Sequence, residues 1–306
     1  MDPLTHALIG GLTAKTVKVS RRRFWIMVLL GNVPDLDVLA NGLGSWAYFI
    51  QHRGLSHSLL GVIFQTVFFA WVLKRWDPGE FKTRILHYFI PIFSHIACDY
   101  LTSYGVPLLA PYTFYNFSAD LVGGVELIPI IFMSFGLLWL YYKEQQGWKA
   151  TRSLWAAWGI YLVLSFTGKA YATKLTDLQK EGLTTVPSMI NPFCWRAVYW
   201  DPSTRNYHYY SVNLLKKRCE PTLVFPGPPS DWVVKASLKS EKVMRFLMDN
   251  RWPVVRVNRE NENWKVEWGN IMFSARGTVR GKVAVTVSPS GKILEEKNSF
   301  TFWEPT

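Results

Sequence analysis

The sequence predicts an all-α, polytopic membrane helical bundle with a metal cluster over residues 1–172, followed by a soluble α+β domain over residues 173–306. The first observation behind this prediction is that two apolar runs, residues 58–73 and 121–142, carry almost no charge. The second observation is that the run at 121–142 reaches the roughly 20 residues that a bilayer-spanning helix needs. The third observation is that the composition becomes that of a soluble domain after Ala172, so we expect two domains.

Six hydrophobic segments follow one another in the first domain, and the first two are short enough to be re-entrant or half-buried instead of fully spanning. The segments are residues 3–17, 24–34, 58–73, 85–101, 121–142 and 153–170. Lysine and arginine gather at residues 18–23, 74–84 and 143–152, whereas residues 102–120 contain neither. Because basic turns stay in the cytoplasm, we expect the N-terminus, residues 102–120 and the whole C-terminal domain on the opposite side of the membrane.

The net charge of +12 and the three cysteines exclude several classes of protein. Basic residues beside apolar segments are typical of cytoplasmic anchors, so we expect no nucleic-acid partner. The first 17 residues begin with an acid and place their basic residues last, which is not the order of a cleavable signal peptide. Three cysteines are too few for a disulfide-rich scaffold. Cys98 is expected to be a small buried residue, while Cys194 and Cys219 can pair only on an oxidising side.

The ionisable residues of the first domain gather at the non-cytoplasmic ends of the predicted segments. They are Asp2, His6, Asp35, Asp37, His52, His57, His95, Asp99, Asp120 and Glu126. His95 and Asp99 are four residues apart and therefore project from one face of a helix, as do Asp2 and His6. Ionisable groups at membrane depth cost about 2.5–3.5 kcal/mol each on insertion, so they are functional by default. Four of the six histidines in the chain belong to this set, which predicts one shared site.

Imidazoles mixed with carboxylates are the ligands of zinc, manganese and iron centres, and this set is larger than one ion requires. The sequence therefore predicts two or more divalent metal ions, zinc first, with manganese or iron as alternatives. His52 and His57 come from the stretch HRGLSHS, in which Ser56 can cap the next helix and Arg53 can meet an anion or lie on the surface. Each element alone has an ordinary structural explanation, but their coincidence on one face favours a metal site.

Several motifs resemble those of the YdjM-like, LexA-regulated inner-membrane family of membrane-bound metal-dependent hydrolases. The motifs are MDPLTHALIGG (1–11), NVPDLD (32–37), HRGLSHS (52–58), HIACD (95–99), TSYG (102–105), ADLVGGVELIP (119–129) and NPFCWR (191–196). This family is in turn distantly similar to zinc-dependent phospholipases C and single-strand-specific zinc nucleases, which are helical proteins with a zinc cluster. The resemblance implies a bacterial inner-membrane location. It implies the metal ligands His6, Asp35, His52 or His57, His95 and Asp99.

The soluble enzymes in that wider group have further ligands, namely a second helical pair of a histidine and an acid, and a processed N-terminal amine. This sequence shows neither of these features. Asp120 and Glu126 stand where late ligands are expected. We therefore count Asp120, Glu126, Asp2 and Ser56 as additional ligands or as groups that contact ligands.

The expected activity is hydrolysis of a phosphoester or phosphodiester in a lipid-like substrate at the outer face of the inner membrane. Metal ions bridged by carboxylates can bind a phosphoryl oxygen, activate water and stabilise in-line attack. Asp35 or Asp37 is then the bridging ligand or the base, and Arg53 neutralises the substrate phosphate. The expected partners are the lipid bilayer and an amphiphilic small molecule. The alternative is a non-catalytic metal-binding membrane scaffold or a metal-ion carrier.

The C-terminal domain is predicted to be a small α+β module in which residues 237–250 have the spacing of one amphipathic helix. Strand-like aromatic and β-branched content, broken by turn residues, occurs at residues 191–200, 206–215, 264–273 and 281–302. The many tryptophans and tyrosines of this domain are expected to form its core, not a substrate groove. His87 and His208 lie outside the polar cluster and are expected to be structural.

Overall fold

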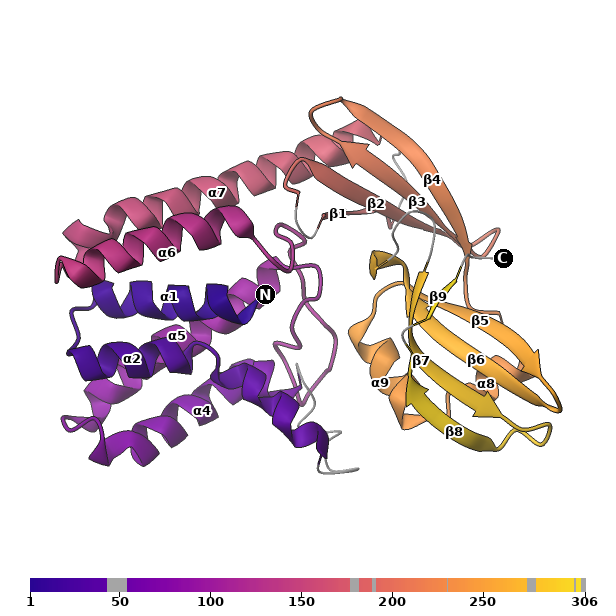
Figure 1. Cartoon of the computed structure of the whole chain (residues 1–306), viewed down its shortest axis with the longest axis horizontal. Helices are drawn as coiled ribbons and strands as arrows, with labels where there is room; N and C mark the ends of the chain where they lie inside the picture. Colours follow the sequence, from indigo (N-terminus) through magenta and orange to yellow (C-terminus); the bar gives the residue numbers. More distant parts are fainter. Residues whose placement is uncertain are drawn as a thin grey trace. The chain divides into compact units, whose positions relative to one another are not determined.

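The computed structural model of the chain is shown in Figure 1, and it describes all but a few short segments. The described residues are 1–42, 54–176, 182–188, 191–229, 231–273, 279–299 and 301–303. The chain forms two compact units. The first comprises Met1–Ala170 and Val186–Phe193, and the second comprises Tyr171–Thr185 and Cys194–Thr306.

Helices that lie roughly alongside one another build the first unit (Figure 1). They are α1 (Pro3–Thr16), α2 (Arg21–Leu30), α4 (Leu59–Val72), α5 (Phe81–Leu101), α6 (Leu127–Tyr142) and α7 (Trp148–Leu175), with the 3₁₀ segments η1 (Val33–Gly42), η3 (Leu55–His57) and η4 (Leu73–Arg75). Side chains of Asp2, Ser20 and Ser58 accept hydrogen bonds from backbone N–H groups in the first turns of α1, α2 and α4. These caps satisfy N–H groups that have no partner inside the helix, and so they fix where each helix starts.

The expected polytopic membrane bundle is wrong, because no helix among the described residues is both long and apolar enough to cross a bilayer. The 14 residues of α4 and the 16 of α6 give about 21 and 24 Å, less than the roughly 30 Å hydrocarbon core. The apolar run at 121–142 is divided, since α6 begins only at Leu127. The longer α5 buries Arg84, His95 and Asp99. The expected multi-pass topology, and the orientation inferred from it, therefore lose their basis.

Two glycines allow α1 and α2 to approach each other closely. A Cβ atom on Gly10 would lie 2.7 Å from the carbonyl oxygen of Met27, and one on Gly31 would lie 2.7 Å from that of His6. Real Cβ atoms do not come this close, so neither position accepts a side chain without moving a backbone. The close contact brings His6 of α1 against the end of α2.

A buried ion pair joins α2 to the segment after α4 at the far end of the unit. The Arg23 guanidinium contacts both carboxylate oxygens of Asp77, with Nε 2.6 Å from Oδ2 and Nη2 2.8 Å from Oδ1. The Tyr88 hydroxyl donates to Asp77 Oδ2 at 2.8 Å. Arg23 Nη1 also lies 3.0 Å from His87 Nδ1, and burial together with this cation lowers the pKa of His87. His87 therefore takes part in a structural network of polar contacts, and the ion pair holds α2 against the segment that follows α4.

The second unit contains two antiparallel sheets with short helices against one of them. The elements are β1 (Thr184–Pro187), β2 (Cys194–Asp201), β3 (Asn206–Asn213), β4 (Arg218–Pro226), α8 (Trp232–Ser237), α9 (Glu241–Asp249), β5 (Pro253–Glu260), β6 (Asn263–Asn270), η5 (Ile271–Phe273), β7 (Val279–Val287), β8 (Ile293–Asn298) and β9 (Phe302–Trp303). The sheets run β1-β2-β3-β4 and β5-β6-β7-β8, with β9 beside β7. Val243 and Phe246 of α9 pack on Trp268 and Val285, so aromatic residues do contribute to the core.

Cys194 and Cys219 are free thiols, so the disulfide considered from the sequence is not formed. Cys194 lies on β2 and Cys219 on β4, and β3 is hydrogen-bonded between them. Neighbouring strands are about 4.8 Å apart, so strands on either side of a third are about 10 Å apart, beyond the roughly 7 Å limit between the Cα atoms of a disulfide. Cys98 is buried, as a small core residue would be.

Candidate metal centre

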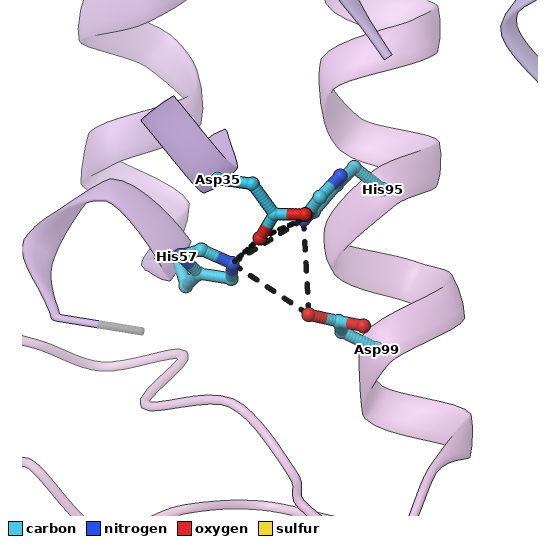
Figure 2. Close-up of side chains that lie close together, drawn as sticks. All are labelled: Asp35, His57, His95 and Asp99. Atoms are coloured by element: carbon cyan, nitrogen blue, oxygen red, sulfur yellow. Dashed lines mark hydrogen bonds and ion pairs between the residues drawn. The ribbon is translucent and has the colours of Figure 1, made fainter. Parts of the chain in front are cut away.

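Three separate segments of the first unit bring ionisable side chains to one point. His95 and Asp99 lie one turn apart on α5, so the helical period places both on the same face. Asp35 follows Pro34 in η1, and His57 ends η3, directly before α4. Figure 2 shows the four side chains pointing toward a common centre.

The ligand atoms of these four residues all lie within 4.8 Å of one another. His57 Nε2 is 3.3 Å from Asp35 Oδ1 and 3.6 Å from Asp99 Oδ2. His95 Nε2 is 3.3 Å from His57 Nε2 and 3.5 Å from Asp35 Oδ1. Side chains of His57, His95 and Asp99 are essentially inaccessible, whereas that of Asp35 is 22% exposed. The cluster is therefore buried on three sides and open at Asp35.

The orientation of His95 is that of a metal-binding imidazole. Its Nδ1 lies 2.7 Å from the carbonyl oxygen of Gly31, which can only accept a hydrogen bond. Nδ1 is therefore the donor in this contact, and Nε2 is the ring nitrogen that faces the cluster. A histidine that binds a metal ion usually donates its other ring N–H to a carbonyl or a carboxylate in this way.

Asp37 and Ser56 hold His57 from behind. His57 Nδ1 lies 3.4 Å from Asp37 Oδ2 and 3.0 Å from the Ser56 hydroxyl, which itself donates to Asp37. The side-chain amide of Gln65 donates to the Ser56 carbonyl at 2.7 Å. Asp37 therefore lies behind His57 and is not one of the four clustered groups. Ser56 does not cap α4, because Ser58 takes that role.

His6 lies beside the cluster and adds a fifth buried group. Its ring stacks on that of His95, with centroids 3.7 Å apart. Its Nε2 is 3.5 Å from Asp99 Oδ1, and neither ring nitrogen makes a hydrogen bond to any residue that the structure describes. The terminal nitrogen of Met1 also contacts Asp99. Asp99 thus faces His57 and His95 with one oxygen, and His6 with the other.

The charges of the clustered groups depend on one another. Burial lowers the pKa of His6 to about 4, so this imidazole is neutral at physiological pH. Burial alone would raise the pKa of Asp35, but hydrogen bonds from His57 and His95 outweigh it and hold this pKa well below its usual range. Burial would also lower the pKa of His57, yet its hydrogen bonds to Asp35 and Asp37 raise it. Asp35 is therefore ionised at physiological pH, as a carboxylate that binds a cation must be.

Three acids expected as additional ligands are used elsewhere in the first unit. Asp2 caps α1 by accepting from the backbone N–H and the hydroxyl of Thr5. Asp120 Oδ2 lies 3.9 Å from the ammonium of Lys169. Glu126 accepts hydrogen bonds from the Tyr161 hydroxyl and the Gly123 N–H. None of these three belongs to the four-residue group, and His52 and Arg53 lie outside the described residues.

Sequence reasoning missed the backbone contribution to this site. The Gly31 carbonyl fixes the tautomer of His95, but a backbone oxygen leaves no signal in the choice of residue. The signal that did exist at this position is glycine itself, whose missing Cβ allows α1 to come within contact of the turn.

The four clustered groups can hold a divalent metal ion. Two imidazoles and two carboxylates suit zinc, manganese or iron, and the burial of three of the four restricts access by competing water. In both histidines the ring nitrogen that faces away from the cluster, Nδ1, contacts an oxygen atom. This is the Gly31 carbonyl for His95 and the Ser56 hydroxyl for His57. The residues present therefore fit a metal centre in their donor atoms and in how these are oriented.

Comparisons with known proteins relate the chain to a membrane family. Residues 1–174 match the family described as YdjM inner membrane protein. The chain is 22% identical over 325 aligned positions to the uncharacterized protein YfhP of Bacillus subtilis (strain 168), and the alignment covers 99% of the chain and 95% of that relative. No solved structure matches the chain.

Proposed function

The chain belongs to the YdjM inner membrane protein family, and from this membership together with the His/Asp cluster we propose that it is a membrane-associated, metal-dependent hydrolase. Its substrate is a phosphoester or phosphodiester in a lipid-like molecule. The observation that carries the proposal is the convergence of Asp35, His57, His95 and Asp99 within 4.8 Å at a site open on one side. A distant relationship to zinc-dependent phospholipases C and zinc nucleases, implied by the motifs, agrees with this chemistry.

The four clustered residues would hold the ion, and the exposed edge at Asp35 is where substrate would enter. A divalent ion in such a site supplies a Lewis acid for a phosphoryl oxygen and activates water at neutral pH. Asp35 is the clustered carboxylate nearest to solvent, so we assign to it the role of bridging ligand or base that faces the attacking water. Asp37 and the Gly31 carbonyl position the two imidazoles and do not touch the reacting atoms.

The proposed centre holds two or more ions, with zinc as the first candidate. Asp99 presents one oxygen to His57 and His95 and the other to His6 and the terminal nitrogen of Met1, so a second ion held by His6 and Asp99 would take the place of that nitrogen. His6 is buried and neutral, and its ring nitrogens have no hydrogen-bond partner among the described residues. It is therefore available as a ligand to a second ion.

Exposed apolar side chains on two helices support the lipid bilayer as a partner and a lipid-like substrate. Residues three and four apart on one helix share a face. On α4 and α6 the exposed residues include Leu60, Ile63, Phe64, Trp71, Ile131, Phe135, Leu138 and Trp139, each more than half exposed. Apolar surface of this extent is unusual on a monomeric soluble protein and marks a contact surface. The family description, inner membrane protein, agrees with membrane lipid as the proposed occupant.

Metal analysis combined with an activity assay tests the proposal. The full chain, purified in a mild detergent, is expected to contain stoichiometric zinc, manganese or iron and to cleave a chromogenic phosphodiester or a short-chain phospholipid. A chelator should remove the activity, and one of these ions should restore it. Bound metal without hydrolysis of any phosphoester would indicate the non-catalytic scaffold, and absence of metal would refute the centre itself.

Removing the carboxylate behind His57 is expected to weaken metal binding. Asp37→Asn replaces an oxygen that contacts His57 Nδ1 and should lower metal affinity about 10- to 100-fold, the usual effect of losing a partner behind a ligand. Asp120→Asn makes the same chemical change outside the cluster and is the control. Competition with a chelator of known affinity measures both variants. Equal affinity of the two would show that Asp37 does not position His57.

A further inference from the structure

A cavity lies at the opposite end of α1 from the candidate metal centre. It has a volume of about 490 Å³ and is formed where the end of α1, the start of α2 and the end of α6 meet. Its lining includes Lys15, Arg21, Phe24, Tyr141, Tyr142 and Glu144. Lys15 lies nine positions beyond His6 on α1, which corresponds to about 14 Å along the helix axis. The cavity is of the size of a small-molecule site and is distinct from the metal centre.

Lys15 is a buried cation at this cavity. Lys15 is only 6% exposed. Its ammonium lies 5.5 Å from the ring centroid of Phe24 and 5.2 Å from that of Tyr141. Its hydrogen-bond acceptor among the described residues is the Leu140 carbonyl, at 3.3 Å. An ammonium can donate three hydrogen bonds. Lys15 therefore has donors to spare for a ligand in the cavity.

A second cation faces the same aromatic ring. The Arg21 guanidinium lies 5.4 Å from the ring of Tyr141, so Lys15 and Arg21 both contact this ring. The lining contains the two cations Lys15 and Arg21 and one acid, Glu144, so its net charge is positive. Two cations within reach of one cavity repel each other, and an anion bound between them removes that repulsion.

Exposed aromatic rings adjoin the mouth of the cavity. Tyr142, which lines it, is 79% exposed, and Trp25, whose ring centroid is 5.9 Å from that of Tyr141, is 51% exposed. Aromatic residues next to lysine and arginine are typical of protein surfaces at the level of lipid headgroups. We propose that this cavity binds the phosphate group of an anionic amphiphile between Lys15 and Arg21, with Trp25 and Tyr142 against its apolar portion.

Binding of a short-chain anionic lipid to the full chain tests this proposal. The ligand is dihexanoyl phosphatidylglycerol, titrated calorimetrically into the protein in a neutral detergent, with glycerol phosphate as the soluble comparison. Arg21→Gln should weaken binding about tenfold or more, because a charge-assisted contact to phosphate is lost. The matched control is Arg22→Gln, which removes the same charge from the same turn, where Arg22 donates to the Trp76 carbonyl at 2.9 Å. Lys15→Gln should act like Arg21→Gln.

The outcomes separate the possible ligands. Tighter binding of the lipid than of glycerol phosphate, lost in Arg21→Gln and kept in Arg22→Gln, supports a lipid headgroup. Equal binding of the two ligands with the same pattern supports phosphate recognition from a soluble ester. Equal weakening in Arg21→Gln and Arg22→Gln would reduce the effect to general surface attraction and overturn the proposal, as would lack of saturable binding. Metal content, measured on the same samples, reports separately on the metal centre.

Discussion

Replacing His95 by alanine is expected to lower metal affinity by more than about 100-fold, beyond the range for losing a partner behind a ligand, and to abolish hydrolysis. His95 Nε2 faces the cluster, because Nδ1 on the other side of the ring donates to the Gly31 carbonyl. The other three clustered residues cannot replace it, because Asp35, His57 and Asp99 already supply their own ligand atoms to the same centre. Elemental analysis and a phosphodiester assay measure the two effects.

The matched control for this variant is His208→Ala, which removes a histidine from β3 in the second unit. His208 Nε2 lies 3.7 Å from Asp201, far along the chain from the cluster. This variant should keep its metal and its activity. Circular dichroism should show native helix content in both variants. Retention of stoichiometric metal by folded His95→Ala would contradict the assignment of the centre.

Replacing Asp77 by alanine is expected to lower the free energy of unfolding by about 3–5 kcal/mol, the usual cost of breaking a buried ion pair. The Arg23 side chain is only 13% exposed and would lose both carboxylate oxygens, while the fully buried Tyr88 would lose its acceptor. Chemical denaturation followed by circular dichroism measures the change. Metal content should be retained in the folded fraction, because the cluster lies at the other end of the helices.

Arg22→Ala is the comparison for this second prediction. Arg22 is the exposed neighbour of Arg23, and its contact is a hydrogen bond to the Trp76 carbonyl. Its loss should cost about 1 kcal/mol or less, as is usual for exposed charges. Similar destabilisation by both variants would show that the Arg23–Asp77 pair contributes no more than a surface contact.

The positions of the helices and the membrane family could be predicted from the sequence, but whether the helices span a membrane could not. The run at 58–73 corresponds to α4 (Leu59–Val72) and that at 85–101 to α5 (Phe81–Leu101). Apolar content along the chain marks such segments well. Whether a run forms one helix depends on local hydrogen bonds. At 121–142 the first six residues are not helical, and there the side chain of Glu126 accepts a hydrogen bond from the Gly123 N–H.

The same distinction applies to the site residues. The spacing of His95 and Asp99 required only that α5 be helical, so their convergence followed from the sequence. Asp35 and Asp37 lie in a 3₁₀ segment, where about three residues complete a turn and two residues advance by about 240°. They therefore face different directions, and only Asp35 joins the cluster. Asp2 is a helix cap, and sequence spacing cannot distinguish a carboxylate used locally from one used at a distant site.

The four clustered residues come from three segments that meet only when η1, η3 and α5 pack together. An unfolded chain does not present them to an ion at once, so an ion that binds there favours the packed state by mass action. Every tenfold rise in free ion concentration above the dissociation constant adds about 1.4 kcal/mol to the stability of the first unit. Availability of the ion in the cell thus becomes a determinant of how much of the protein survives proteolysis.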